Sequence, residues 1–275
     1  MSTTASRVGR DGALALRFER RGAGTVLAAS RSVLPLQVLA PLTLDDVATV
    51  VSMLNPTGGV LGGDRLTVEV DVGDAAHACV TTPSATRIYR TERGPAEQTV
   101  RLAVGAGASL EWVPDHTIPF PGSALRQSIE ADVGEGACLI LVDAWAAGRI
   151  ARGEAWQFSR IDSAITVHDG GGLVLHDRFL LPLEVAADGL GLAEASPYFA
   201  SVVVVADDGI GHLTDALADV AIGGATLGAA RLARRGLLVR CLAASAPALG
   251  DALEVIWRLA RREILKRPPL SLRKG

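Results

Sequence analysis

The amino-acid sequence predicts a mainly β fold built from layered antiparallel sheets. Three observations lead to this prediction: the composition, many short runs in which apolar and polar residues alternate, and a weak glycine-centred repeat. The 275 residues are 49% hydrophobic and only 4% aromatic, and they include 30 glycines. A core can therefore form from Ala, Val, Leu and Ile, with frequent turns at glycine.

The N-terminal part predicts a loose tail followed by strands. Residues 1–11 are largely polar, as chain ends without fixed structure often are. Between Ala13 and Leu39, apolar residues alternate with polar or charged ones. This pattern predicts two or three strands, with a turn marked by Gly22 and Gly24.

The middle of the chain carries the repeat. It reads VDVGDAA, LAVGAGA and ADVGEGA in three places, and the first glycines of these copies are Gly73, Gly105 and Gly134. An alternating strand precedes and follows each copy, so each predicts a strand, a tight turn and a return strand. One such hairpin cannot bury its apolar face, but three stacked hairpins can, so we expect layered sheet across Asn55–Phe179.

The last third of the chain predicts a further hairpin, more strands and short helices. Ser163–Leu180 contains two alternating strands around the turn letters DGGG. Ser201–Ala206 and Leu237–Ala243 have the pattern of strands. Leu213–Val220 and Gly228–Arg235 are expected to be short helical stretches.

The C-terminal region predicts an amphipathic α-helix over residues 249–267. Its apolar residues fall on one stripe, with acidic residues near its start and arginines near its end, as the helix dipole favours. Pro268 and Pro269 end it. No polar linker divides the chain, so the sequence predicts a single domain over residues 1–275.

Composition also narrows the class of protein. The formal net charge is −3 at pH 7, so no broad basic field favours nucleic acid as a partner. The three cysteines are odd in number and widely spaced, which fits core positions in a reducing compartment better than disulfides. No signal peptide and no apolar run of membrane-spanning length are present in the sequence, so we expect a cytoplasmic protein.

The glycine-rich segment Asn55–Asp64 (NPTGGVLGGD) resembles a phosphate-binding loop only superficially. No Lys-Ser or Lys-Thr pair follows it, and it leads into a predicted strand over Arg65–Val72 instead of a helix. A strained turn between strands is the favoured interpretation. Asp64 is the one group in this segment that could bind a cation.

The segment TTPSATRIYR, Thr81–Arg90, supports two interpretations that the sequence leaves open. Arg and Tyr are favoured anchors in protein interfaces, so Thr82, Arg87, Tyr89 and Arg90 could form a contact face. Alternatively, the hydroxyl groups could bond to their own backbone in a solvated turn.

Two further positions could bind a metal ion. Asp115 and His116 are suitable ligands for Ni²⁺ or Zn²⁺, but adjacent strand residues face opposite ways, so one inward and one outward side chain is the favoured interpretation. Asp143 ends an apolar strand and must be paired or at an edge, with Arg149 or Arg152 as the expected partner. Weak metal binding is the alternative.

No set of catalytic residues is evident in the sequence. It contains neither a GxSxG nor an HExxH motif, and the five histidines are scattered. The chain is therefore not expected to be an enzyme.

Four ordered blocks of the sequence resemble the UreD (UreH) family of urease accessory proteins. They are NPTGGVLGGDRL, TTPSATRIYR, LEWVPDHTIPF and the GRIARGE stretch, and the resemblance is densest from Leu54 to Leu181. It implies a mainly β fold with sandwich or helical-coil character and two or so α-helices, including a C-terminal one. The family often has Gln-Glu where Asp115 and His116 stand here, so the resemblance assigns no exact metal ligands.

The resemblance also implies a function without catalysis. Such proteins act in the cytoplasm with UreF and the GTPase UreG, bind apo-urease and assist Ni²⁺ delivery through a proposed internal passage. Carboxylates suspected of lining that passage correspond to Asp64, Asp143 and Asp177. Nickel would be transient cargo, with no permanently bound cofactor, and the proteins could dimerise within the accessory complex.

Three hypotheses follow. The first is a scaffold and nickel conduit, and the second is a pure interaction scaffold that holds its partners without conducting metal. The third is a β-fold enzyme that uses the 55–64 loop, and it ranks last. Candidate docking residues are those of the 81–90 segment and Trp257 on the C-terminal helix, for which plain packing against the sheet is the favoured alternative.

Overall fold

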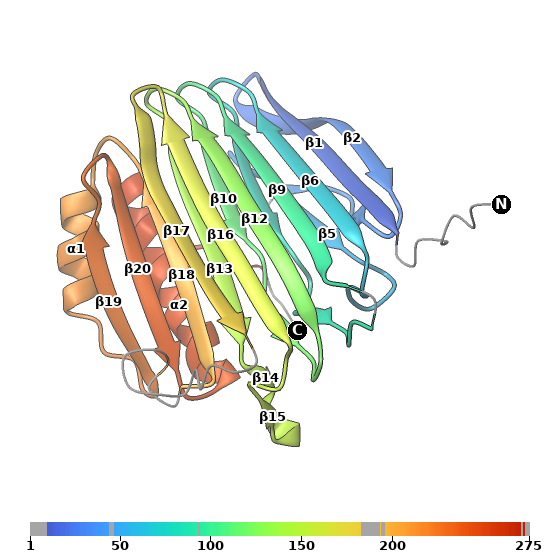
Figure 1. Ribbon diagram of the computed structural model, residues 1–275. Coiled ribbons are helices and arrows are strands. Elements are labelled where there is room, and N and C mark those ends of the chain that lie inside the picture. The colour runs from blue at the N-terminus through green and yellow to red at the C-terminus, as the bar shows by residue number, and fades with distance from the viewer. Residues whose placement is uncertain are drawn as a thin grey trace.

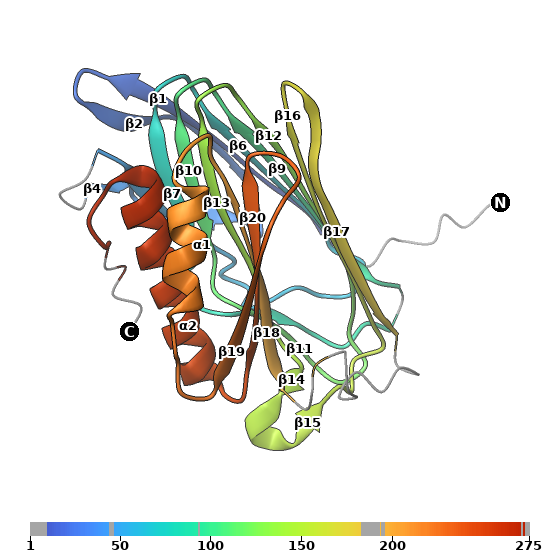
Figure 2. The ribbon, with the colours of Figure 1, turned by 90° about the vertical axis from the view of Figure 1, so that its left-hand side faces the viewer.

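The computed structural model describes residues 10–43, 47–92, 94–182, 193, 196–270 and 272. Within these residues two large β-sheets face each other, and two α-helices cover the outer side of one sheet (Figures 1 and 2). The mainly β, layered fold with two helices is therefore confirmed.

The strands, in chain order, are β1 (Asp11–Arg21), β2 (Gly24–Val33), β3 (Gln37–Val38), β4 (Leu42–Thr43), β5 (Thr49–Leu54), β6 (Arg65–Val72), β7 (His77–Thr81), β8 (Thr86–Ile88), β9 (Ala96–Val104), β10 (Ser109–Val113), β11 (Thr117–Pro119), β12 (Ala124–Val133), β13 (Cys138–Ala146), β14 (Gly148–Arg149), β15 (Glu154–Ala155), β16 (Arg160–Asp169), β17 (Gly172–Pro182), β18 (Tyr198–Val205), β19 (Ala225–Arg231) and β20 (Gly236–Ala243). The helices are the α-helices α1 (Ile210–Ala218) and α2 (Ala246–Ala260), a 3₁₀ turn (Ile150–Arg152) and a π-helical turn (Arg261–Leu265).

The central part of the chain winds as a coil, passing back and forth from one sheet to the other. The first sheet has the order β17-β16-β12-β9-β6-β1-β2, and the second has the order β19-β20-β18-β13-β10-β7-β5-β3. Successive strands of the coil alternate between them, so each strand lies beside the equivalent strand of the next turn. The ladders β6–β9, β9–β12, β7–β10 and β10–β13 are accordingly parallel.

The prediction that the three glycine repeats are antiparallel hairpins is wrong. Each repeat is a corner at which the chain passes from one sheet to the other, and the corners stack on one another. The Gly105 N–H donates to the Val72 carbonyl at 2.8 Å, and the Gly134 N–H donates to the Val104 carbonyl at 2.8 Å. A Cβ on Gly105 would lie 2.8 Å from the Asp74 backbone nitrogen and 2.9 Å from the Gly73 carbonyl carbon, so the stacked backbones leave no space for a side chain.

Antiparallel pairing occurs at the two ends of the coil, where the sequence correctly predicted it. β1 pairs with β2 through the turn at Gly22, and β16 pairs with β17 around the DGGG turn. β18 and β20 also add antiparallel strands to the second sheet. The predicted helical stretch Gly228–Arg235 is wrong, because its first half belongs to β19, which is an edge strand paired with β20, and its second half is not helical.

Two apolar cores hold the three layers together. One fills the space between the sheets, and the other lies between the second sheet and the two helices (Figure 2). β18 lies in the middle layer, and its residues 200–205 are all buried, which explains its continuous apolar sequence. In the described part of the chain, no helix has both the length and the apolar character required to cross a bilayer.

The predicted C-terminal helix is confirmed, with an earlier start. Ser245 caps α2, accepting a hydrogen bond on its side chain from the Ala248 N–H at 3.3 Å. Beneath the helix, Arg261 and Glu111 form an ion pair that is fully buried. This pair ties the helix end to β10 in the centre of the second sheet.

Candidate functional site

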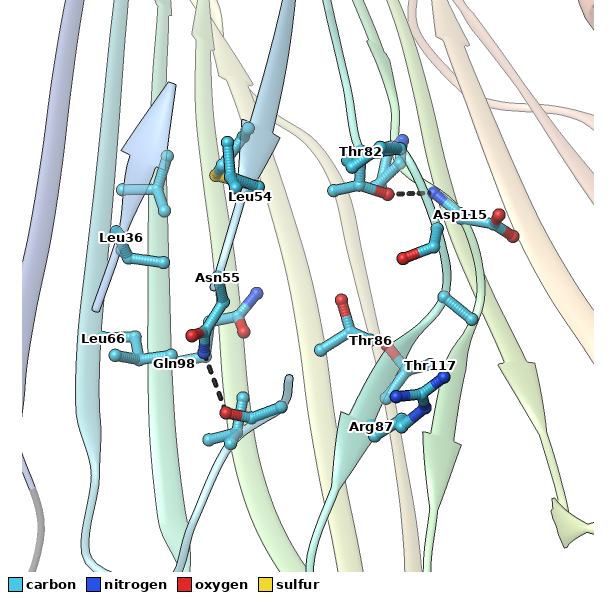
Figure 3. Close-up of a pocket in the computed structure, with 18 of the residues that line it drawn as sticks. Leu36, Leu54, Asn55, Leu66, Thr82, Thr86, Arg87, Gln98, Asp115 and Thr117 are labelled. Carbon is cyan, nitrogen blue, oxygen red and sulfur yellow. Dashed lines mark hydrogen bonds between the residues drawn. The ribbon is translucent and has the colours of Figure 1, made fainter. Parts of the chain in front are cut away.

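A cavity of about 250 Å³ lies between the two sheets, toward one end of the coil. Several segments singled out in the sequence meet there: the 55–60 loop, the 82–87 segment, and the residues that follow β10. Figure 3 shows Asn55 and Gln98 on one side of the cavity and Thr82, Asp115 and Thr117 on the other. The coil therefore gathers motifs that are far apart in the sequence around one space.

The glycine-rich loop is the turn between β5 and β6 that the sequence predicted. The Asn55 amide donates to the Gly59 carbonyl at 2.8 Å, and its oxygen accepts from the Thr57 N–H at 3.0 Å. A Cβ on Gly59 would lie 2.6 Å from the Tyr89 ring, so the loop packs directly on the next segment of the coil. The loop thus forms a fixed wall of the cavity.

Asp64 holds this loop in place from outside the cavity. Its side chain is buried and accepts the Leu61 N–H at 2.9 Å and the Arg10 N–H at 2.8 Å. A carboxylate that accepts backbone N–H groups on both oxygens stabilises a turn. Asp64 is not among the residues that line the cavity.

Asp143 is the buried carboxylate of the cavity, and only 6% of the residue is exposed. Gln127 Nε2 donates to its Oδ1 at 2.9 Å, and the Ser163 hydroxyl lies 3.3 Å from its Oδ2. Burial raises the pKa of the Asp143 carboxyl above its usual value, and the nearby Asp177 carboxylate acts in the same direction. The expected pairing with Arg149 is wrong, because Arg149 forms a bidentate ion pair with Glu154.

Asp115 and His116 lie together in a bend after β10. The carboxylate Oδ1 of Asp115 accepts the His116 backbone N–H at 2.8 Å and lies 2.8 Å from His116 Nδ1. The favoured interpretation, with one side chain inward and one outward, is therefore wrong because the strand ends at Val113. Asp115 lines the cavity, and its N–H donates to Thr82 Oγ1 at 2.8 Å.

Asp177 lies on β17 and contacts the other sheet. Its Oδ1 accepts from Arg240 Nη2 at 2.5 Å, and Arg240 also donates to Ser201 Oγ at 2.5 Å. Asp177 does not line the cavity. Among the described residues, no three His, Cys, Asp or Glu side chains are grouped closely enough to hold a metal ion.

The predicted docking residues differ in their surroundings. Thr82 is buried, whereas Arg87 and Arg90 are exposed. Tyr89 is half-buried and donates its hydroxyl to the Gly58 carbonyl at 3.2 Å. Trp257 donates its indole N–H to Glu111 Oε2 at 2.6 Å, so its polar atom is engaged inside the molecule.

Sequence reasoning missed the neutral polar residues of the cavity. Gln98 and Gln127 line it, and Gln127 also donates to Ser163 at 3.0 Å. The sequence pattern that could have identified them is a polar residue at an inward-facing position of an alternating strand. Gln127, between the inward-facing Leu125 and Ile129, is such a residue. Together with two carboxylates, these groups provide oxygen atoms that can bind a divalent cation weakly.

The comparisons with known proteins agree along nearly the whole chain. A family model described as "UreD urease accessory protein" matches residues 10–274. A relative from Haloarcula marismortui, named "Urease accessory protein UreD", is 35% identical over 272 residues, which are 97% of this chain and 91% of the relative. A relative of the same name from Deinococcus radiodurans is 34% identical over 266 residues, or 96% and 95% of the two chains. One from Cupriavidus necator is 43% identical over 143 residues, 52% of this chain and 50% of the relative.

Proposed function

Because the chain belongs to the UreD family of urease accessory proteins, we propose that it is a scaffold for urease maturation. In this proposal it binds apo-urease together with UreF-like and UreG-like proteins in the cytoplasm and assists delivery of Ni²⁺ to the urease active site. The family consists of accessory proteins, not enzymes. The nickel ion is cargo that passes through, so no cofactor is permanently bound.

The cavity between the sheets is the observation that supports nickel handling. It is lined by Asp115 and Asp143, together with the amide side chains of Asn55, Gln98 and Gln127. Oxygen ligands of this kind bind Ni²⁺ more weakly than imidazole or thiolate groups do, and a passage must release the ion as well as accept it. In this proposal the Ni²⁺ ion binds transiently in the cavity on its way to urease.

Asp115, His116 and Asp143 have distinct roles in this proposal. Asp143 provides a buried carboxylate that is oriented by Gln127. Asp115 provides a second carboxylate, and the 2.8 Å contact between its Oδ1 and His116 Nδ1 fixes the orientation of both side chains. The proposal does not extend to Asp64 and Asp177, because both carboxylates already hold other parts of the chain in place.

A pure interaction scaffold remains the second candidate. It is favoured by the small number of charged groups in the cavity and by the exposed arginines of the 81–90 segment. The enzyme hypothesis loses its proposed site, because the 55–64 loop is packed against Tyr89 and its Asp64 is occupied by backbone N–H groups.

Reconstitution of urease tests the scaffold function. Apo-urease from the same organism is expressed with its other accessory proteins, with or without this chain, and the nickel content and activity of the urease are measured. We expect low nickel content and low urease activity without the chain. We also expect the chain and apo-urease to elute together as a complex from a sizing column. Equal nickel content with and without the chain would refute the proposal.

A further inference from the structure

We propose that the end of the coil near β14 and β15 is a docking face for an acidic surface of a partner protein. The face consists of residues in or next to β8, β11, β14 and the 3₁₀ turn: Arg87, Tyr89, Arg90, Phe120, Arg149 and Arg152. Arg87 also lines the cavity. Figure 2 shows β11, β14 and β15 at one end of the molecule. This inference rests on the proposed scaffold function. It specifies the surface that binds and the charge of the surface that it binds.

Aromatic contacts join three residues of this face, Tyr89, Phe120 and Arg149, across three turns of the coil. The rings of Tyr89 and Phe120 meet edge to face with centroids 5.1 Å apart. The Arg149 guanidinium lies 4.3 Å from the centre of the Phe120 ring. Arginine and tyrosine are the residue types that most often carry binding energy in protein interfaces, so this is a suitable composition for docking.

The backbone beneath the face is fixed by close contacts. The Val60 N–H donates to the Arg87 carbonyl at 2.8 Å, and the Tyr89 N–H donates to the Val60 carbonyl at 2.9 Å. A Cβ on Gly122 would lie 3.2 Å from Arg90 Cγ, so the arginine side chain lies directly over a glycine with a φ of +71°. A rigid surface loses little conformational entropy on binding, which favours affinity.

Three of the four arginines on this face lack a carboxylate partner in the described part of the chain, and the fourth, Arg149, pairs with Glu154. On the outer face of the first sheet, Arg65 lies 3.2 Å from Glu97, Arg101 lies 3.1 Å from Glu69, and Arg178 lies 2.9 Å from Asp162. By contrast, Arg87, Arg90 and Arg152 are exposed and form no ion pair with any carboxylate in the described part of the chain. A partner surface that carries carboxylates would provide ion-pair partners for these arginines.

A protein surface fits this face better than nucleic acid does. The unpaired arginines of this face are few, whereas affinity for a phosphate backbone depends on many such contacts. The aromatic rings are edge to face and partly buried, so they offer no open stacking platform for bases. The observations therefore favour carboxylates on a folded partner.

Charge reversal tests the docking face in the full-length protein. The double variant Arg87→Glu/Arg90→Glu is compared with Arg31→Glu/Arg231→Glu, which reverses two exposed arginines that also lack ion pairs but lie on the edge strands β2 and β19. Binding to purified apo-urease and to a purified UreF-like protein is measured for each. We expect the first variant to lose about 30-fold in affinity for one of the two proteins, and the second to match the wild type.

The outcomes separate this inference from the scaffold function. If the wild type binds and both double variants bind equally well, the docking face is refuted while the scaffold function stands. If the wild type binds neither protein, the scaffold function fails and the docking face fails with it. Arg87→Lys/Arg90→Lys should retain most of the affinity, and a short RNA duplex should not compete. Competition by that duplex would overturn the assignment to a protein partner.

Discussion

Asp143 is a buried carboxylate whose unfavourable burial the proposed function would explain. Its carboxyl group is buried beside the amide of Gln127 and the hydroxyl of Ser163, with no cation within ion-pair distance among the described residues. A buried carboxylate without a counter-ion is unfavourable, and this is why its pKa is raised. The proposed visiting ion would supply the missing positive charge.

The first prediction concerns the variant Asp143→Asn. The raised pKa means that the folded state keeps its proton to higher pH than the unfolded state, so this group reduces stability as pH rises from about 4 toward neutrality. An amide can still accept from Gln127 and carries no charge. We expect the variant to be more stable than the wild type at pH 7, with the difference shrinking toward pH 4.

Urea unfolding of both proteins at several pH values measures this effect. Asp132→Asn, an exposed carboxylate on the outer face of β12, is the matched control and should change stability little. A variant Asp143→Asn that is less stable than the wild type at pH 7 would contradict the prediction.

At the scale of single residues, the sequence identified polar residues near the cavity but did not predict which side chains they contact. The sequence predicted that Asp143 ends an apolar strand and is paired or at an edge. This is wrong, because Asp143 lies within β13 and is buried without an ion pair among the described residues. Its hydrogen-bond partners could not be predicted, because Gln127 and Ser163 lie on strands of the opposite sheet that reach Asp143 only through the coil. The contact between Asp115 and His116 was missed for a local reason: the position at which β10 ends decides whether adjacent side chains diverge or meet.

At the scale of elements, the C-terminal helix depends on one buried ion pair. Arg261 and Glu111 are both fully buried, and Arg261 Nε also donates to the Pro268 carbonyl at 2.9 Å. The apolar stripe of α2 predicted its packing on the sheet, and its inner face carries buried residues such as Leu249 and Ile256. The ion pair was not predicted, since Glu111 is an acid in a strand whose other residues are apolar or small.

The second prediction is a large loss of stability in Arg261→Ala. Removal of the guanidinium leaves the Glu111 carboxylate buried and uncompensated, which costs about 3–5 kcal/mol. Arg262→Ala, the exposed neighbour, should change the free energy of unfolding by no more than about 0.5 kcal/mol. Guanidinium unfolding compares the two variants.

A double variant distinguishes an uncompensated charge from lost packing. Glu111→Gln/Arg261→Met removes both charges and keeps similar volumes, so it should recover much of the stability lost in Arg261→Ala. If the double variant is as unstable as the single variant, the cost comes from packing and not from the buried carboxylate.

At the scale of the whole molecule, the repeat positions the cavity. Stacked glycine corners keep the turns of the coil in register at one end, and short parallel strands such as β8 and β11 join them at the other. The sequence predicted the repeat and the layers, but not the parallel pairing. Strands that flank a tight turn usually pair with each other, and only the three-dimensional coil separates them into opposite sheets.

The family and the geometry bear on different parts of the proposed function. Membership of the family supports a role in urease maturation. The cavity is lined by two carboxylates, several neutral oxygen groups and one arginine, Arg87, a lining that favours weak binding of a passing ion over tight binding. Nickel transfer through this cavity is the central claim of the proposed function.

The most direct test measures the nickel content of urease matured with the Asp143→Asn protein. If nickel passes through the cavity, this variant should still form the complex with apo-urease but load several-fold less nickel than the wild type or Asp132→Asn. Normal nickel loading by Asp143→Asn, with the complex intact, would contradict the passage of nickel through the cavity.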